Sequence, residues 1–237
     1  MAVRAVFFDL YETLITEFAN GKRFSKRSYD YMYRLGLSEA EFKQEWSTRF
    51  ERRMNGHFPD YHSVIRDILD SRSLPYPQEH VEFLYQSRVS DKKIPFHTIS
   101  KEICRMLELL REQGLRLGLI SNCSEEEVVS FGQSGLAPYF DDVIFSYQVG
   151  VAKPNAEIYR LACDRLSVTP QDSLFIGDGG SDELSGAGSA GLRPYQAYWY
   201  NTFIESEYEK IHQPLHVLDL IESSIEMEST NNETAGH

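Results

Sequence analysis

The chain has 237 residues, of which 36 are acidic and 24 basic, so its formal net charge is −12 at pH 7. This length suits one domain with a large insertion, or two small domains. The acidic balance argues against general binding to nucleic acid or to anionic membranes, because phosphate groups attract positively charged surfaces. No apolar run in the sequence approaches the roughly 18 residues that a membrane-spanning helix needs.

The three cysteines, Cys104, Cys123 and Cys163, are far apart and form neither a CxxC motif nor a disulfide framework. Scattered cysteines of this kind are typical of reduced thiols. The first residues also lack the layout of a secretory signal peptide. We therefore expect a cytoplasmic protein.

Short apolar runs that recur along the chain predict the strands of a parallel sheet. The first is 3–8, which is β-branched and aromatic and is followed at once by polar residues. Similar runs follow at 115–120, 143–145, 174–176 and 195–198, and 216–218 is a candidate for a last short strand. Amphipathic helical patterns lie between these runs. Strands that alternate with helices predict a doubly wound, Rossmann-like α/β fold.

Residues 16–97 interrupt this alternation and read as several helices with no convincing strand. Ser38 and Glu41 form a capping box, and apolar residues then recur at helical spacing. We therefore expect a helical module inserted after the first strand, with 1–15 and 98–225 forming the α/β core. Residues 226–237 are polar and poor in apolar side chains, which predicts a disordered tail.

Polar groups stand at the ends of the predicted strands. Asp9 follows the first strand, Ser121 ends the second, and Asp178 follows a later strand on a glycine-rich turn. Lys153 precedes a predicted helix. Because parallel strands present their carboxyl ends at one edge of a sheet, these groups are expected to meet there. A nucleophilic carboxylate, a hydroxyl donor, a lysine and an acidic cluster form a coherent site for phosphoryl transfer.

This ordered set resembles the motifs of the haloacid dehalogenase (HAD) superfamily. The four motifs are matched in order by Asp9 with Thr13, by Ser121, by Lys153, and by Asp178 with Asp182. The helical insertion resembles the C1 cap of subclass I. The resemblance covers the chain except its tail and implies a hydrolase on a HAD core.

The resemblance also implies a role for each residue. Asp9 would be the nucleophile that forms a covalent aspartyl intermediate, with Thr13 and Ser121 as hydrogen-bond donors and Lys153 as the neutralising cation. Mg²⁺ would be bound by Asp9, Asp178 and the backbone carbonyl of Tyr11, and Asp182 or Glu183 would hold metal-bound water. The choice between these two acids stays open. The residues expected to contact substrate are Tyr11, Ser121, Asn122 and Lys153.

Tyr11 departs from the phosphatase pattern, in which a second Asp stands two residues after the nucleophile and protonates the leaving group. A phenol, with a reference pKa of about 10, is a poor replacement near neutral pH. The 2-haloacid dehalogenases carry Tyr at this position, since a halide leaves without a proton. They use no metal, however, and an Asp178 beside Asp9 would then be an unneutralised pair of like charges. Tyr159 also matches a dehalogenase tyrosine, or is simply a packed aromatic residue.

The sequence therefore favours a Mg²⁺-dependent phosphatase that acts on a small phosphorylated metabolite. A 2-haloacid dehalogenase-like hydrolase and a non-catalytic binding or regulatory protein on the same scaffold are the alternatives. The expected partner is a small anionic molecule, phosphorylated or carboxylated, and neither nucleic acid nor membrane is expected. The protein is expected to be a monomer or a homodimer.

Overall fold

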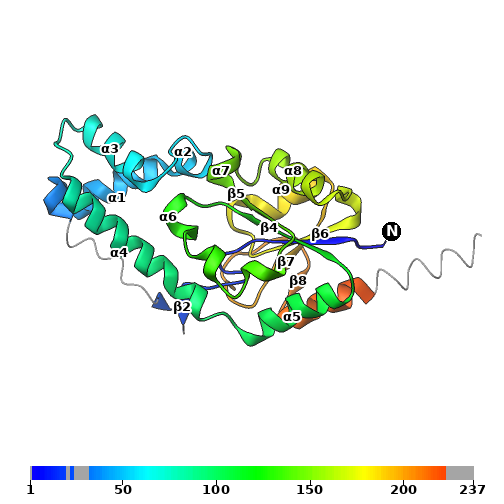
Figure 1. Cartoon of the computed structure of the whole chain (residues 1–237). Helices are drawn as coiled ribbons and strands as arrows, with labels where there is room; N and C mark the ends of the chain where they lie inside the picture. Colours follow the sequence, from blue (N-terminus) through cyan, green and yellow to red (C-terminus); the bar gives the residue numbers. More distant parts are fainter. Residues whose placement is uncertain (1, 20–21, 24–31, 223–237) are drawn as a thin grey trace, which may run out of the picture.

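A six-stranded parallel sheet forms the centre of the molecule (Figure 1). The computed structural model describes residues 2–19, 22–23 and 32–222, so the predicted tail at 226–237 lies outside the described residues. The strand order is β5-β4-β1-β6-β7-β8, and every neighbouring pair is parallel. The strands are β1 Ala5–Phe8, β4 Arg116–Ser121, β5 Asp142–Phe145, β6 Ser173–Gly177, β7 Arg193–Ala197 and β8 Lys210–Ile211.

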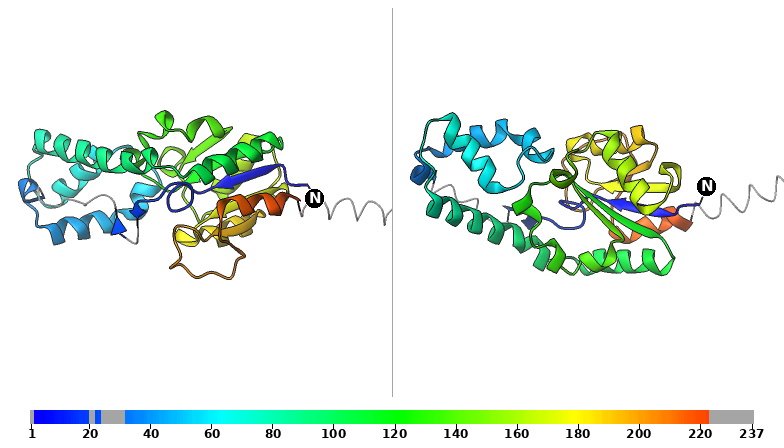
Figure 2. Two further views of the ribbon diagram at one scale, coloured as in Figure 1. Left: turned by 90° about the horizontal axis from the view of Figure 1, so that it is seen from below. Right: turned by 45° about the horizontal axis from the view of Figure 1, so that its top comes forward.

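Helices cover both faces of this sheet (Figure 2). The helices of the core are α5 Lys101–Glu112, α6 Glu125–Val128, α7 Ser146–Val149, α8 Ala156–Leu166 and α9 Glu183–Ala190. Val6 and Phe8 of β1 pack into one apolar cluster with α5, and Phe7 packs into a second cluster with α8 and α9. Successive residues of a strand point to opposite faces, so the continuous apolar run reflects burial on both sides. The predicted fold class is confirmed.

The inserted helices, which we call the cap, lie at the end of the sheet toward which β1 runs (Figure 1). They are α1 Glu39–Thr48, α2 Phe50–Met54, α3 Tyr61–Ser71 and α4 Gln78–His97, preceded by the 3₁₀ turn η1 Met32–Leu35. These helices bury an apolar cluster of their own, which includes Phe42, Ile65 and Val81. The predicted capping box between Ser38 and Glu41 begins α1.

Five short 3₁₀ turns complete the described core: η2 Phe131–Gln133, η3 Ala137–Tyr139, η4 Pro170–Asp172, η5 Gly180–Asp182 and η6 Pro214–His216. No helix of the described residues has the length and apolarity that crossing a bilayer requires.

Two sequence-based expectations were wrong. The candidate strand at 216–218 is the end of η6 followed by helical residues 217–222, and the sixth strand is instead β8. The run was too short to distinguish a strand from a buried helical segment. The insertion also contains a small antiparallel pair, β2 Phe18–Ala19 with β3 Lys22–Arg23, where only helices were expected.

Helix α9 packs closely against the segment that follows Lys153. A Cβ at Gly186 would lie 2.4 Å from the main-chain oxygen of Pro154. Gly188 on the same helix is exposed, and a Cβ there would meet atoms only at 3.6 Å or more. The glycine at 186 therefore permits contact between α9 and the segment that carries Lys153.

We expect Gly186→Ala to lower the free energy of unfolding by about 1–3 kcal/mol, because the added methyl group overpacks against main chain that cannot give way. The matched substitution Gly188→Ala should be neutral or stabilising by up to about 1 kcal/mol, since Ala favours helix. Urea denaturation of both variants measures this difference. Equal stability of the two would contradict the contact at residue 186.

Candidate active site

The buried ammonium of Lys153 joins the motif segments at the carboxyl edge of the sheet. Its Nζ donates hydrogen bonds to Asp9 Oδ1 and to Glu183 Oε2. Carboxylate oxygens of Asp9, Asp178 and Glu183 lie within 4.8 Å of one another, and all three residues are buried. Asp9, Lys153 and the turn at residues 178–183 are far apart in sequence, so the sheet topology brings these three segments together.

Asp9 is held in place by the strand that precedes it and by a tight turn that follows. Its N–H donates to the oxygen of Ile176 in β6 at 2.9 Å. After it the chain folds back, with the N–H groups of Leu14 and Ile15 donating to Leu10 O at 2.9 and 3.0 Å. The turn returns the hydroxyl of Thr13 to Asp9, where Oγ1 lies 3.4 Å from Oδ2.

Asn122 fixes the main chain of Lys153. Its Nδ2 donates to Lys153 O and its Oδ1 accepts from Lys153 N, both at 2.8 Å. Ser121 is buried at the end of β4, and β4 pairs with β1. In this geometry Asn122 positions the main chain of Lys153. The expected contacts of Asn122 and Ser121 with substrate stay predictions.

The structure distinguishes between the two acids that the sequence left open. Glu183 is 1% exposed, lies in the carboxylate cluster and accepts the N–H of Gly179 at 3.0 Å. Asp182 is exposed and is not part of the cluster. A Cβ at Gly177 would lie 2.2 Å from Glu183 Oε1, so the glycine before Asp178 makes room for this carboxylate. The geometry favours Glu183 over Asp182 as the acid that would stand beside a bound metal.

The charges of the cluster suit a hard divalent cation. Three carboxylates face one lysine, so the cluster has two excess negative charges in a buried space when all three are ionised. Burial raises the pKa of Asp9, which Lys153 counteracts, and burial with the neighbouring carboxylates raises the pKa of Glu183 to about 8. Oxygen ligands of this kind are those that Mg²⁺ prefers. The residues present therefore fit the metal that the sequence implied, with Asp9 and Asp178 as the groups that would hold it.

The phenol of Tyr11 lies between the cap and the core and contacts both. Its O–H donates to the main-chain oxygen of Glu127 at 2.7 Å, and Lys92 Nζ lies 4.5 Å from the centre of its ring. Burial, with the charge of Glu127, raises the pKa of Tyr11 well above its usual value. Glu12 is also occupied, since its carboxylate accepts from Thr16 Oγ1 and from the N–H of Glu17.

A network of buried ion pairs joins α4 of the cap to α6 of the core. Tyr85, Arg88 and Lys92 recur every three or four residues, so they lie on one face of α4. Arg88 pairs with Glu126 at 2.6 Å and with Glu127 at 2.9 Å, and the Glu126 side chain is fully buried. Lys92 pairs with Glu127 at 2.9 Å and with Glu17 at 3.1 Å. Sequence reasoning missed this network because the two helices are 28 residues or more apart along the chain.

Two further residues outside the motifs support the site. The Tyr159 hydroxyl donates to the main-chain oxygen of Glu183 at 2.6 Å, and its ring packs edge-on against Phe175. Tyr159 is thus a packed aromatic that also fixes the acid cluster. Asn201 Nδ2 donates to Asp178 Oδ2 at 2.7 Å. The sequence offered one signal for Asn201, since it stands just beyond a predicted strand, where ligand-binding residues gather.

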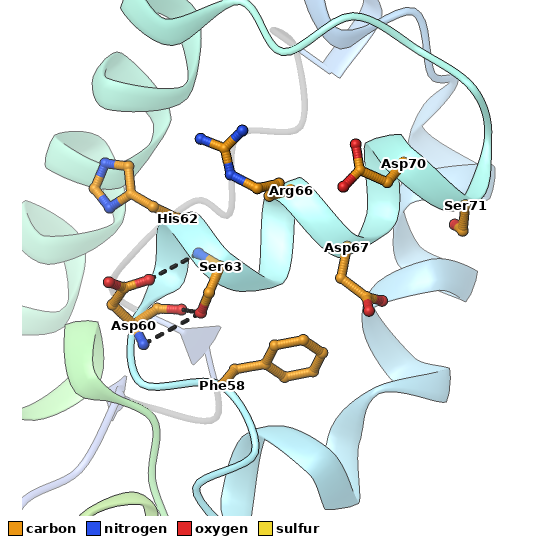
Figure 3. A pocket seen from close by; sticks show the side chains of 8 residues that line it. All are labelled: Phe58, Asp60, His62, Ser63, Arg66, Asp67, Asp70 and Ser71. Atoms are coloured by element: carbon orange, nitrogen blue, oxygen red, sulfur yellow. Dashed lines mark hydrogen bonds between the residues drawn. The ribbon is translucent and has the colours of Figure 1, made fainter.

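A hollow of about 530 Å³ lies between α2 of the cap and the core loop that carries Lys153. Its lining includes Phe50 and Met54 from the cap and Asn122, Lys153 and Asp182 from the core. This volume is within the range of small-molecule sites. A second hollow, shown in Figure 3, is lined only by cap residues between 58 and 71, so it contains none of the motif residues.

Known proteins resemble this chain in sequence and in fold. A family model described as "haloacid dehalogenase-like hydrolase" matches residues 3–191. The chain belongs to this family of hydrolases. It is 25% identical over 191 residues to a glyceraldehyde 3-phosphate phosphatase of Methanopyrus kandleri, a match that covers 80% of this chain and 82% of the relative.

Solved structures of two kinds resemble this hydrolase. A HAD phosphatase from Thermococcus onnurineus matches with a TM-score of 0.63 and 22% identity, over 92% of this chain and 98% of that one. A 2-haloacid dehalogenase from Pseudomonas syringae matches with a TM-score of 0.64 and 20% identity, over 93% and 99% of the two chains. At these identities the likeness shows the fold, and the side chains must distinguish the two activities.

Removing one partner of the network between cap and core should destabilise the hydrolase. We expect Arg88→Met to lower the free energy of unfolding by about 3 kcal/mol, because it leaves the buried Glu126 without its cation. Arg105→Met is the control, since both partners of its ion pair with Glu108 are half exposed and exposed pairs of this kind contribute little to stability. Chemical denaturation measures both values, and equal losses would argue against a structural role for the network.

Proposed function

We propose that this hydrolase is a Mg²⁺-dependent phosphatase that acts on a small phosphorylated metabolite through an aspartyl-phosphate intermediate. The observation that carries the proposal is the position of Asp178, whose carboxylate lies with those of Asp9 and Glu183 beside Lys153. A metal-free reaction at Asp9 would gain nothing from a second, unneutralised acid in its immediate surroundings.

In this mechanism Asp9 attacks phosphorus, so that a bond forms between its carboxylate and phosphorus while the bond to the leaving oxygen breaks. Water then hydrolyses the acyl phosphate, which releases phosphate and regenerates Asp9. Thr13 and Ser121 donate hydrogen bonds to the transferred group or the nucleophile, and Lys153 neutralises negative charge on both. The bound metal would supply further charge neutralisation at the phosphoryl oxygens.

The relatives, and the hollow beside the loop of Lys153, support the proposed substrate class. The glyceraldehyde 3-phosphate phosphatase named above and a phosphoserine phosphatase of Thermus thermophilus, 32% identical over 116 residues, act on the small phosphorylated compounds in their names. The hollow beside Lys153 has room for a molecule of that size. In this proposal residues 16–97 form the cap, and residues 1–15 and 98–225 form the core.

The position of Tyr11 limits which substrates react quickly. Its hydroxyl is committed to Glu127 O, and the carboxylate of Glu12 is committed to its own turn. Neither residue therefore protonates the leaving oxygen. Such a proton transfer contributes about 10²–10⁴-fold to a rate. Substrates whose leaving groups are stable anions, such as acyl and aryl phosphates, are the ones that this site favours.

A second candidate function, dehalogenation of a 2-haloacid, is favoured by Tyr11 itself. A halide needs no proton, so the lack of an acid at position 11 would carry no penalty. That reaction also requires a cap cation for the substrate carboxylate. The candidates for this cation are Arg23, Arg27 and Arg34 of the insertion. Arg23 pairs with Glu17 at 2.8 Å, Arg34 lies beside Tyr33, and Arg27 lies outside the described residues. Release of halide without metal would support this function.

We expect phosphate release from p-nitrophenyl phosphate to exceed release from an alkyl phosphate by at least about 10²-fold. The p-nitrophenolate leaves as a stable anion, whereas an alkoxide leaving group needs a proton that neither Tyr11 nor Glu12 donates. Both activities should require Mg²⁺ and should be abolished by EDTA. A colorimetric phosphate assay of the two esters, with and without metal, measures this.

Asp9→Asn is the control, since it removes the nucleophile from a position where an amide fits. Turnover that survives this substitution would exclude Asp9 as the nucleophile. Comparable rates for the two esters would show that another group acts as the acid. Phosphate release from neither ester would count against a simple phosphomonoesterase, and halide release would then be measured.

A further inference from the structure

The loop that follows β7 reaches back to two of the motif segments. Trp199 Nε1 donates to the main-chain oxygen of Thr13 at 2.8 Å, and Asn201 Nδ2 donates to Asp178 Oδ2 at 2.7 Å. Thr13 belongs to the turn after β1, and Asp178 follows β6. One short segment thus contacts both the loop of the proposed nucleophile and the carboxylate of the proposed metal site.

The orientation of the Asn201 side chain is determined by its other hydrogen bond. Its Oδ1 accepts the N–H of Phe203 at 3.1 Å, so the amino group is the end that faces Asp178. The loop itself is held by internal bonds. The Tyr198 hydroxyl donates to Thr202 O at 2.7 Å, and Gln196 Nε2 donates to Ile204 O at 2.8 Å. Asn201 therefore extends from an ordered loop.

The two oxygens of Asp178 each accept one bond, and the donors come from different parts of the chain. Oδ1 accepts the N–H of Gly180 at 2.9 Å, and Oδ2 accepts from Asn201. A carboxylate oxygen has two lone pairs, so each oxygen keeps one for a cation. Two donors on opposite oxygens fix the rotation of the carboxylate, which Gly180 alone would not do.

We propose that Asn201 is a positioning residue that holds the Asp178 carboxylate in the orientation that binds the divalent cation. The proposal rests on the proposed function, because it requires a metal at Asp178. Hydrogen-bond partners of this kind orient ligating carboxylates, and their removal lowers metal affinity by about 10–100-fold. Asn201 does not act on the substrate itself, so the loss falls on metal affinity rather than on turnover at saturating metal.

The test compares Asn201→Ala with Tyr198→Phe in the full chain. Tyr198→Phe removes a hydrogen bond within the same loop and leaves Asp178 untouched. Binding of Mn²⁺ is measured by electron paramagnetic resonance in the absence of substrate, and the Mg²⁺ dependence of kcat is measured separately. We expect Asn201→Ala to bind Mn²⁺ about 10–100-fold more weakly, with kcat at saturating Mg²⁺ close to that of the wild type. Tyr198→Phe should bind Mn²⁺ as the wild type does.

Three outcomes would overturn the proposal. Wild-type affinity in Asn201→Ala would do so, and so would an equal loss in Tyr198→Phe, which would assign the effect to order in the loop. Asp178→Asn is included to recognise failure of the proposed function. If neither the wild type nor Asp178→Asn binds Mn²⁺, both proposals fall. Asn201→Leu keeps the branching of the side chain at Cγ but has no donor, and it should show the same loss, including where the alanine variant does not fold.

Discussion

The candidate site depends on one buried cation. The Lys153 side chain is 2% exposed and donates to both Asp9 and Glu183. Without its positive charge, three buried carboxylates would repel one another at close range. The surrounding structure accordingly fixes this lysine from its main chain outward. Asn122 binds its N–H and C=O, and α9 packs on the next residue through Gly186.

Tyr11 shows that one position cannot serve two purposes at once. Two residues after the nucleophile, it lies where a carboxylic acid would be useful for chemistry. Its ring instead packs against the ammonium of Lys92, and its hydroxyl binds the main chain of Glu127. Lys92 and Arg88 in turn hold the pKa of Glu127 well below its usual range, against the effect of burial. Tyr11 therefore belongs both to the turn that follows Asp9 and to the contact between cap and core.

Fold similarity does not choose between the two chemistries of this family. A phosphatase and a dehalogenase superpose on the hydrolase with nearly the same TM-score, 0.63 and 0.64. The distinction rests on a few side chains at the ends of the strands. Asp178, with its two hydrogen-bond donors, has the charge and order expected of a metal ligand. Tyr11 is the feature for which the sequence suggested a likeness to dehalogenases, and its hydroxyl donates to Glu127 O.

The sequence alone determined the fold class and the edge of the sheet at which several candidate site residues lie. Buried parallel strands read as continuous apolar runs, and the polar residue after each run must lie at the carboxyl edge, so Asp9, Ser121 and Asp178 could be placed by topology. Local patterns also placed the capping box at Ser38, because its hydrogen bonds join residues only three apart. The division into a cap at 16–97 and a core stays a prediction at its boundaries.

Only the tertiary structure decided which side chains face one another. Asp182 and Glu183 are neighbours in sequence, but Asp182 is exposed and Glu183 lies in the carboxylate cluster. The left-handed backbone conformation of Ser181 and Asp182 produces this difference. The contacts of Arg88 with Glu127 and of Asn201 with Asp178 join residues 39 and 23 positions apart. No local pattern encodes such pairs, because they depend on how separate elements pack, and packing is set by the whole chain.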